Sequence, residues 1–230
     1  FDPTTSSPMQ NLLRPDMTAD ELRDLARAAF YPAPSDQIFD AKSGRAWGRS
    51  DFDLNPDMVN EVDFSEPVGA AAVLVPIVAS SEMTILLTKR SSALKRHRGQ
   101  IAFPGGRVED ADADSAATAL RETEEEIGLD RDFIEPLGYL DSYRTRTGFQ
   151  ITPLVGLVRP GFTLKLDPRE VEDAFEVPFA FLMNPDNHRR DQLEWQGRPR
   201  HFYAMPYGPH YIWGATAGMI KNLHERLIQA

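Results

Sequence analysis

Short apolar segments, separated by polar and turn-rich stretches, recur along this chain. Four of them are rich in Val, Ile, Leu and aromatic residues, which predicts strands at residues 68–79, 83–88, 134–143 and 149–158. Because only the polar segment 144–148 separates the last two, we expect them to pair across a turn. Residues 194–205 have the pattern of a β-hairpin that turns at Gln196 and Gly197.

Helix signals mark other parts of the chain. Thr18 and Glu21 form the pattern of a capping box, which predicts a helix that runs to about Phe30. The sequence also favours helices at residues 113–127, 169–175 and 215–228. Strands that alternate with a few helices predict an α/β fold, with a mixed β-sheet flanked by helices. We expect one domain in residues 67–230, preceded by an extension in residues 1–66 that carries one helix.

The helix predicted at residues 113–127 concentrates carboxylates near its end. At about 100° per residue, Glu122, Glu125 and Glu126 share one face, whereas Glu124 points away and is expected in solvent. Gly128 is expected to end the helix, so the acidic groups lie in the last turns, where the helix dipole is already negative. A hard divalent cation would offset this repulsion, and such cations prefer oxygen ligands.

The run of glutamates alone would also fit a solvated acidic helix face. Two neighbouring features favour a metal site instead. Gly105 and Gly106 allow a close approach of the backbone just before the helix. Arg121 directly precedes the cluster, where its guanidinium could hold one carboxylate in a fixed rotamer.

Together these residues resemble the Nudix hydrolase signature, which reads Gly-x5-Glu-x7-Arg-Glu-U-x-Glu-Glu-x-Gly-U, where U is apolar. Residues 121–129 (RETEEEIGL) fit the second half, with Thr123 in an apolar place. The first half departs, because Asp112 replaces the first Glu and eight residues separate it from Arg121. This modified box is similar to that of the coenzyme A diphosphatase branch of the family.

A second motif, upstream of the box, is similar to the same branch. Residues 86–91 (LLTKRS) and 99–106 (GQIAFPGG) match the pattern that precedes the box there. One position differs, because Lys95 stands where that pattern has an Arg, which keeps the charge but loses the planar two-pronged donor. Weaker similarity extends to residues 149–153, 170–178 and 213–217.

The resemblance implies an α/β/α sandwich with a mixed β-sheet, in which the box forms a loop-helix-loop metal site for Mg²⁺ or Mn²⁺. The metal ligands that it implies are the Gly106 carbonyl and the carboxylates of Glu122, Glu125 and Glu126. Asp112 is expected to stabilise the box through Arg121, which we include among the catalytic residues, rather than to bind metal. The general base is left open between Glu125 and Glu170, and Glu170 could equally be a carboxylate at the start of a helix.

The branch resemblance implies that the substrate is coenzyme A or an acyl derivative, cleaved to adenosine 3′,5′-bisphosphate and (acyl-)4′-phosphopantetheine. No acidic residue occurs between Ile85 and Phe103, so an anionic substrate would meet positive potential there. The residues expected to contact its phosphates, with Gln100 as a hydrogen-bonding partner, are Arg90, Lys95, Arg96 and Arg98. The alternative is a solvated basic loop.

Composition limits the other partners. A net charge of −10 argues against nucleic-acid binding. The longest apolar run, residues 70–79, is too short to cross a bilayer and contains Pro76, so we expect no membrane segment. The chain has no Cys, which permits a reducing compartment. We therefore expect a cytoplasmic protein that acts on a small molecule, and a homodimer is left open.

Two other functions remain open. One is a Nudix hydrolase of another nucleotide, such as ADP-ribose or a nucleoside triphosphate. The other is a Nudix-like binding module without catalytic activity, against which the complete set of three glutamates weighs.

Overall fold

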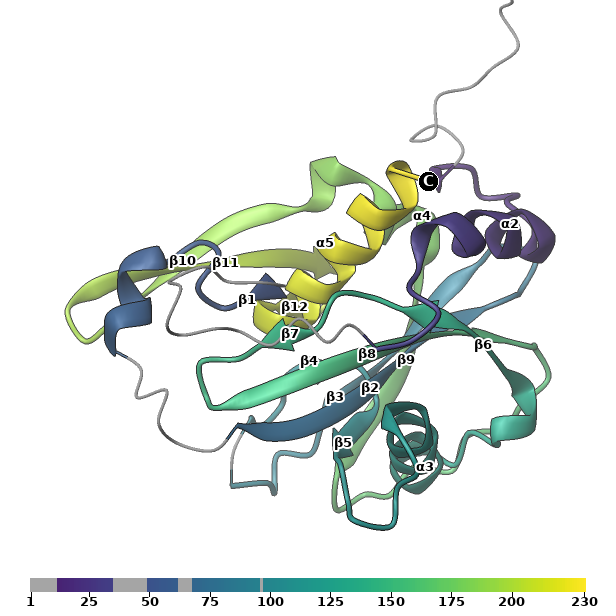
Figure 1. Ribbon diagram of the computed structural model, residues 1–230, viewed down its shortest axis with the longest axis horizontal. Coiled ribbons are helices and arrows are strands. Elements are labelled where there is room, and N and C mark those ends of the chain that lie inside the picture. Colours follow the sequence, from purple (N-terminus) through teal and green to yellow (C-terminus); the bar gives the residue numbers. More distant parts are fainter. Residues whose placement is uncertain (1–11, 35–48, 62–67, 96) are drawn as a thin grey trace, which may run out of the picture.

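The computed structural model describes residues 12–34, 49–61, 68–95 and 97–230, and in them two β-sheets and four α-helices are arranged in layers (Figure 1). The strands are β1 (Arg49–Ser50), β2 (Gly69–Val78), β3 (Thr84–Arg90), β4 (Ile101–Ala102), β5 (Gly105–Arg107), β6 (Ile134–Tyr139), β7 (Tyr143–Arg144), β8 (Phe149–Val158), β9 (Val171–Pro178), β10 (Arg189–Trp195), β11 (Arg198–Tyr207) and β12 (His210–Trp213). The α-helices are α2 (Ala19–Ala29), α3 (Ser115–Ile127), α4 (Phe179–Met183) and α5 (Gly214–Ile228), and the 3₁₀ helices are η1 (Pro56–Glu61), η2 (Arg131–Phe133) and η3 (Pro185–Asn187).

The main sheet is mixed, as the sequence predicts. Its strands follow the order β1-β7-β8-β2-β3-β4, with β5 paired to β2, β6 to β8 and β9 to β3. At its centre β2 runs parallel to β8 along its whole length, while β3 pairs antiparallel with β2. From Val73 to Val78 the central strand is buried throughout, and its continuous apolar sequence is typical of a strand covered on both faces.

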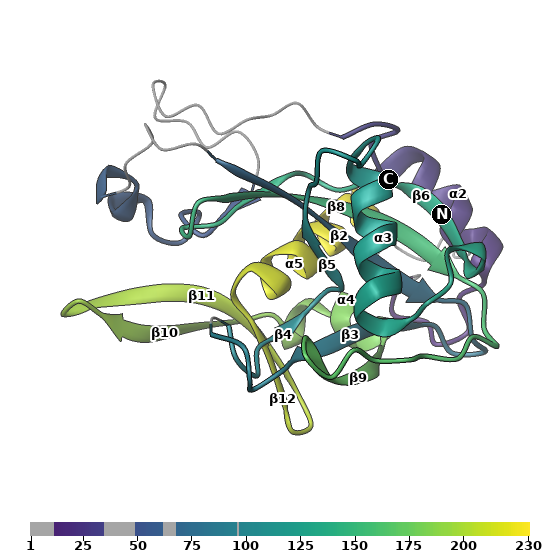
Figure 2. The same ribbon diagram turned by 90° about the horizontal axis from the view of Figure 1, so that it is seen from below.

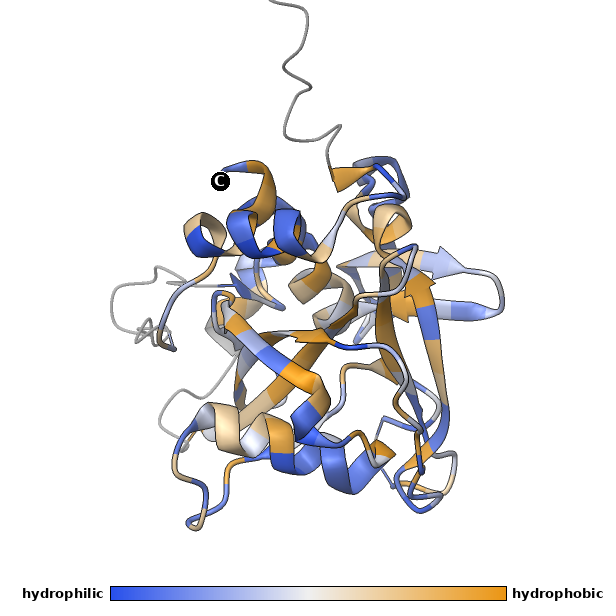
Figure 3. Cartoon of the chain, turned by 90° about the vertical axis from the view of Figure 1, so that its right-hand side faces the viewer, coloured by the Kyte–Doolittle hydropathy of each residue, from blue (hydrophilic) through white to orange (hydrophobic). Residues whose placement is uncertain are grey.

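Helices cover both faces of this sheet. Helices α2, α4 and α5 pack into one hydrophobic core, and α3 packs into a second core on the opposite face (Figures 1 and 2). The hydrophobic colour is concentrated in the central strands, whereas the peripheral loops are mainly hydrophilic (Figure 3). The expected α/β class, a mixed sheet flanked by helices, is therefore confirmed. In the described part of the chain, no helix has both the length and the apolar composition that a membrane crossing requires.

The sequence predicts a helix at residues 169–175, and this prediction is wrong. From Val171 the chain forms β9, which pairs antiparallel with β3 from Arg90 back to Thr84. Val171 and Val177 are buried by this pairing. Helical propensity is a weak preference, and hydrogen bonds to a distant strand together with this burial override it.

A separate three-stranded sheet, β10-β11-β12, extends beside the main body (Figure 1). The predicted hairpin is confirmed, since β10 and β11 pair antiparallel around Gln196 and Gly197. Both turn residues have positive φ, 50° and 76°, as a two-residue turn of type I′ requires. The hairpin is longer than expected, because β10 begins already at Arg189.

The helix expected in the N-terminal extension is α2, and its capping box is complete. The Thr18 side chain accepts from the Glu21 backbone N–H, and the Glu21 carboxylate accepts from the Thr18 N–H. Residues 1–11 of this extension and the connection at residues 35–48 lie outside the described residues.

Candidate active site

Helix α3 ends at Ile127, as the sequence predicts, and begins two residues later than expected, at Ser115. The Asp114 side chain accepts from the Ala117 backbone N–H and caps the first turn. Gly128 adopts the left-handed conformation with φ 65° and ends the helix, while its N–H donates to the Glu124 carbonyl. The glutamate cluster therefore lies in the last two turns of α3, as predicted.

Strand β5 brings the two glycines directly against this helix. A Cβ on Gly106 would lie 2.3 Å from the Glu122 carboxylate, so a side chain at this position would displace it. Gly105 has φ 152°, and a Cβ there would lie 2.3 Å from the Ala72 carbonyl oxygen. The close backbone approach expected from the sequence is present. It puts Gly106 beside the helix face of Glu122, Glu125 and Glu126, which we call the acidic face.

The three glutamates on this face have different environments. Glu126 is buried, with 3% of its side chain exposed, and its Oε2 accepts from the Gly105 N–H at 3.1 Å. Burial raises the pKa of Glu126 to about 7, and the nearby charges of Glu170 and Glu122 add to this effect. Glu122 is 15% exposed, and burial also raises its pKa. Glu125 is 62% exposed and faces solvent.

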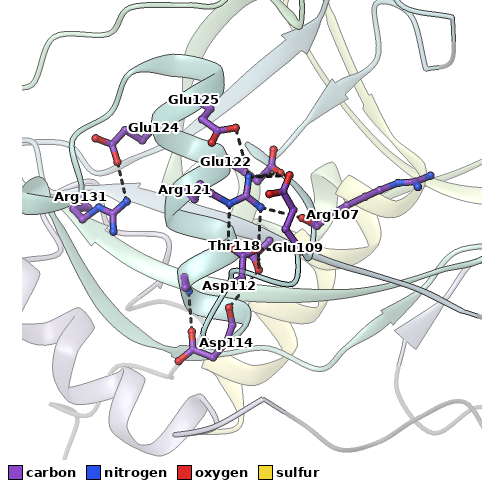
Figure 4. Close-up of polar contacts among 11 residues, drawn as sticks. Arg107, Glu109, Asp112, Asp114, Thr118, Arg121, Glu122, Glu124, Glu125 and Arg131 are labelled. Atoms are coloured by element: carbon purple, nitrogen blue, oxygen red, sulfur yellow. Dashed lines mark hydrogen bonds and ion pairs between the residues drawn. The ribbon is translucent and has the colours of Figure 1, made fainter.

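Arg121 lies in the middle of the box (Figure 4). Its Nε and Nη2 donate to the two carboxylate oxygens of Asp112, each at 2.9 Å, and this ion pair is the one expected from the sequence. Its Nη1 lies 2.9 Å from Glu122 and 3.5 Å from Glu125. The guanidinium thus connects the loop before α3 to two carboxylates of the helix, whereas Glu124 points away and pairs with Arg131 (Figure 4).

Asp112 is anchored by more contacts than the sequence reveals. It is 4% exposed and accepts from the Glu109 N–H and from the Thr118 hydroxyl in addition to Arg121. The Arg121 guanidinium, as the main cause, holds the pKa of Asp112 below its usual range. Sequence reasoning missed Thr118, although its position in the first turn of α3, six residues after Asp112, is compatible with such a contact.

The basic loop, which runs from Arg90 to Gln100, connects the antiparallel strands β3 and β4, and β4 leads on to β5. It brings Arg90 to the acidic face, where its Nη1 lies 3.6 Å from the Glu126 Oε1. Lys95 and Arg98 are exposed on the loop, and the Gln100 side chain contacts His97 Nδ1 at 2.9 Å. Arg96 lies outside the described residues.

Glu170 precedes β9, so the alternative in which it starts a helix is wrong. Its backbone carbonyl accepts from the Ser91 N–H at 2.8 Å, which ties this segment to the base of the basic loop. Its carboxylate is exposed, and its negative charge contributes to raising the pKa of Glu122 and Glu126. Glu170 therefore adds negative charge to the surroundings of Glu122 and Glu126.

The chemistry of these residues fits a divalent cation. The side chains on the acidic face are carboxylates, and hard cations prefer oxygen ligands of this kind. Burial is the main cause that raises the pKa values of Glu122 and Glu126, and the negative charges of neighbouring glutamates add a repulsion that a cation would reverse. Within the described ranges, no three His, Asp or Glu side chains are grouped closely enough to enclose a metal ion as they stand. Arg90 pairs with Glu126, and Arg121 pairs with Glu122. Metal binding would require these carboxylates to turn towards one another.

Comparison with known proteins agrees with this geometry. The model of the NUDIX domain matches residues 69–198. The uncharacterized Nudix hydrolase NudL of Photorhabdus laumondii is 39% identical over 157 residues, which cover 68% of this chain and 84% of that protein. NudL of Escherichia coli K12 is 39% identical over 153 residues, which cover 66% of this chain and 80% of that protein.

Among solved structures, a MutT/nudix family protein from Enterococcus faecalis is similar with a TM-score of 0.46 and 17% identity, over 71% of this chain and 63% of that protein. The matched domain contains β2, β5, α3 and the whole acidic face. Nudix enzymes typically use a divalent metal ion and act on substrates that contain a diphosphate. The chain therefore belongs to the Nudix family and is a Nudix hydrolase, a diphosphatase.

Proposed function

We propose that this enzyme hydrolyses the diphosphate of coenzyme A or acyl-CoA, with Mg²⁺ or Mn²⁺, to adenosine 3′,5′-bisphosphate and (acyl-)4′-phosphopantetheine. The observation that carries this proposal is the position of the basic loop. The loop starts at Arg90, beside Glu126, and returns through β4 to Gly105 and Gly106. The motif that resembles the coenzyme A branch is thus continuous with the acidic face.

The groups that would hold the cation are the Gly106 carbonyl and the carboxylates of Glu122, Glu125 and Glu126. When bound, such an ion neutralises the non-bridging oxygens of a diphosphate and lowers the pKa of the attacking water. Arg121 positions Glu122 and Glu125, since its guanidinium contacts both and is itself fixed by Asp112.

The general base is Glu125 or Glu170. Glu125 is mostly exposed and shares a helix face with Glu122 and Glu126, so it can receive a proton from a water molecule at the acidic face. Glu170 is exposed, and its backbone carbonyl accepts from the Ser91 N–H, which places it next to the basic loop.

The phosphates of the substrate would contact the basic loop. Arg90 lies at the acidic face and is suited to the diphosphate, whereas Lys95 and Arg98 are exposed further along the loop and are suited to the 3′-phosphate. Arg96 and Gln100 belong to the same proposed set. This division explains why an enzyme with net charge −10 would bind an anion here.

Product analysis by mass spectrometry tests the proposal. The purified protein would be incubated with coenzyme A, dephospho-coenzyme A, ADP-ribose and a nucleoside triphosphate, with Mg²⁺ or Mn²⁺ and with EDTA. We expect coenzyme A to have the highest kcat/KM, the two named products to form, and EDTA to abolish turnover. Equal or faster hydrolysis of ADP-ribose would contradict the coenzyme A assignment, and no turnover of any substrate would favour a binding module.

A matched pair of variants on α3 distinguishes a catalytic role of Glu125 from a general effect of negative charge on this helix. Glu125→Gln should lower kcat by about 100-fold or more, because it removes a charged ligand and a candidate base. Glu124→Gln removes the same charge from the next position, but Glu124 faces Arg131, so activity should stay near that of the wild type. If Glu125→Gln stays fully active, the mechanism has to be assigned without this residue.

A further inference from the structure

We propose that Arg90 is a positioning residue that couples cation binding to substrate binding. In the free enzyme its guanidinium partly neutralises Glu126, as the cation would do. When the cation binds, the guanidinium is released and can bind the diphosphate. This inference deepens the proposed function and rests on its metal-dependent chemistry. Three features of the structure support it: a fixed backbone, a buried donor without an acceptor and the contact of the guanidinium with one oxygen of Glu126. A neighbouring lysine with a different partner provides a control.

The backbone of Arg90 is held on both sides. Its N–H donates to the Gln100 carbonyl at 2.9 Å, and its carbonyl accepts from the Gly99 N–H at 3.0 Å. The pairing of β3 with β9 shifts its register between Lys89 and Arg90, an irregularity that re-aims a side chain at the end of a strand. The backbone of Arg90 is therefore fixed beside the acidic face, and only the side chain has to move.

The side chain itself is incompletely bonded. It is 28% exposed, and its Nη1 lies 3.6 Å from the Glu126 Oε1, which is an ion pair but too long for a good hydrogen bond. Its Nε is buried and has no hydrogen-bond acceptor within the part of the chain that the structure describes. A buried donor without an acceptor is costly, so this arginine gains from an incoming anion that accepts two hydrogen bonds.

The two carboxylate oxygens of Glu126 have different neighbours. Its Oε2 is occupied by the Gly105 N–H, and the whole side chain is 3% exposed. Arg90 lies against the other oxygen, Oε1. A divalent cation at Glu126 would therefore compete with Arg90 for this oxygen and repel its charge, which frees the guanidinium for a diphosphate.

The adjacent residue Lys89 provides a matched control. Its Nζ donates to the Glu172 carboxylate at 2.8 Å, so the partner of its charge is not one of the proposed metal ligands. Lys89 and Arg90 are thus neighbouring cations on one strand, and only the second touches a carboxylate of the proposed metal site.

The test is a Mn²⁺ titration of the protein without substrate, followed by electron paramagnetic resonance, together with steady-state kinetics on coenzyme A. Removal of the competing charge in Arg90→Gln should tighten Mn²⁺ binding by about 3- to 10-fold. The same variant should raise KM for coenzyme A by roughly 10-fold, because the diphosphate loses its two-pronged donor. Arg90→Lys should keep the Mn²⁺ affinity near wild type but still raise KM, and Lys89→Gln should change neither.

The opposite signs of the two effects distinguish coupling from a structural role. If Arg90 only supported the fold, Arg90→Gln would weaken Mn²⁺ binding or leave it unchanged, and either result would overturn the inference. Circular dichroism of each variant checks that it folds, and Arg90→Lys retains the charge if Arg90→Gln does not fold. A wild-type protein that binds no Mn²⁺ would overturn the metal-dependent function as well, whereas a substrate other than coenzyme A would overturn only the substrate assignment.

Discussion

At the scale of single residues, identical side chains have acquired different properties from their surroundings. Helical geometry predicts which glutamates share a face, and the structure confirms that Glu124 points away. It does not predict that Glu126 is buried with its pKa near 7, whereas Glu125 remains 62% exposed. That difference depends on Gly105 and Arg90, which reach Glu126 from two strands, and such contacts are set by tertiary packing rather than by spacing along the chain.

The departure of the box from its signature leads to a prediction at this scale. Asp112→Ala should lower the melting temperature by roughly 5 °C or more and reduce kcat severalfold, because it removes the two-pronged acceptor of Arg121 and an acceptor of two further donors. Thermal unfolding followed by circular dichroism, with kinetics on the same preparations, measures both. Because Arg121 lowers the pKa of Asp112, the stabilisation that Asp112 gives the wild-type protein should persist at neutral pH. It should disappear only as the pH falls below the usual range of a carboxyl group.

Glu109 supplies the matched control for this prediction. It belongs to the same loop and faces the same guanidinium, but at 3.9 Å and with 64% of its side chain exposed. Glu109→Ala should therefore change stability and kcat little. Equal effects of the two substitutions would show that general charge, and not the two-pronged pair, holds Arg121.

At the scale of elements, the sequence is informative wherever local rules decide the structure. The capping box of α2, the left-handed Gly128 and the turn at Gln196 and Gly197 were all predictable, because each depends on a few neighbouring residues. Strand β9 was not, because its pairing with β3 connects residues about 80 to 95 positions apart. The same limit applies to the site, where the position of Arg90 follows from the β3–β4 hairpin.

The hairpin turn gives a prediction at this scale. Gly197 has φ 76°, and a Cβ added there would meet no atom within 4 Å, so Gly197→Ala should destabilise the protein by about 1 kcal/mol through backbone strain alone. Gln196 has φ 50°, and Gln196→Asn should stabilise it by up to about 0.5 kcal/mol, because Asn tolerates this conformation better. Urea unfolding measures both, and effects of the same sign would be inconsistent with a turn of type I′.

At the scale of the whole molecule, the catalytic domain and the preceding helix share one core. The family match begins at residue 69, yet Leu22 and Ala26 of α2 are buried in the same cluster as Leu223 of α5. Arg226 of α5 adds a hydrogen bond from its Nε to the Ala29 carbonyl at 2.8 Å. The extension therefore contributes to the fold that supports the site, although its helix lies outside the matched domain.

This shared core predicts that α2 and the catalytic domain unfold together. Leu22 is fully buried, so Leu22→Ala should lower the free energy of unfolding by about 2–5 kcal/mol, whereas Arg27→Ala, at a side chain that is 77% exposed, should change it by less than about 0.5 kcal/mol. The three Trp residues of the chain all lie outside α2, so their fluorescence reports on the rest of the molecule. In urea, the midpoint measured by fluorescence should shift together with the midpoint measured by circular dichroism. If Leu22→Ala instead left the fluorescence transition unchanged, α2 would unfold separately, and the enzyme would be expected to keep its activity without residues 1–31.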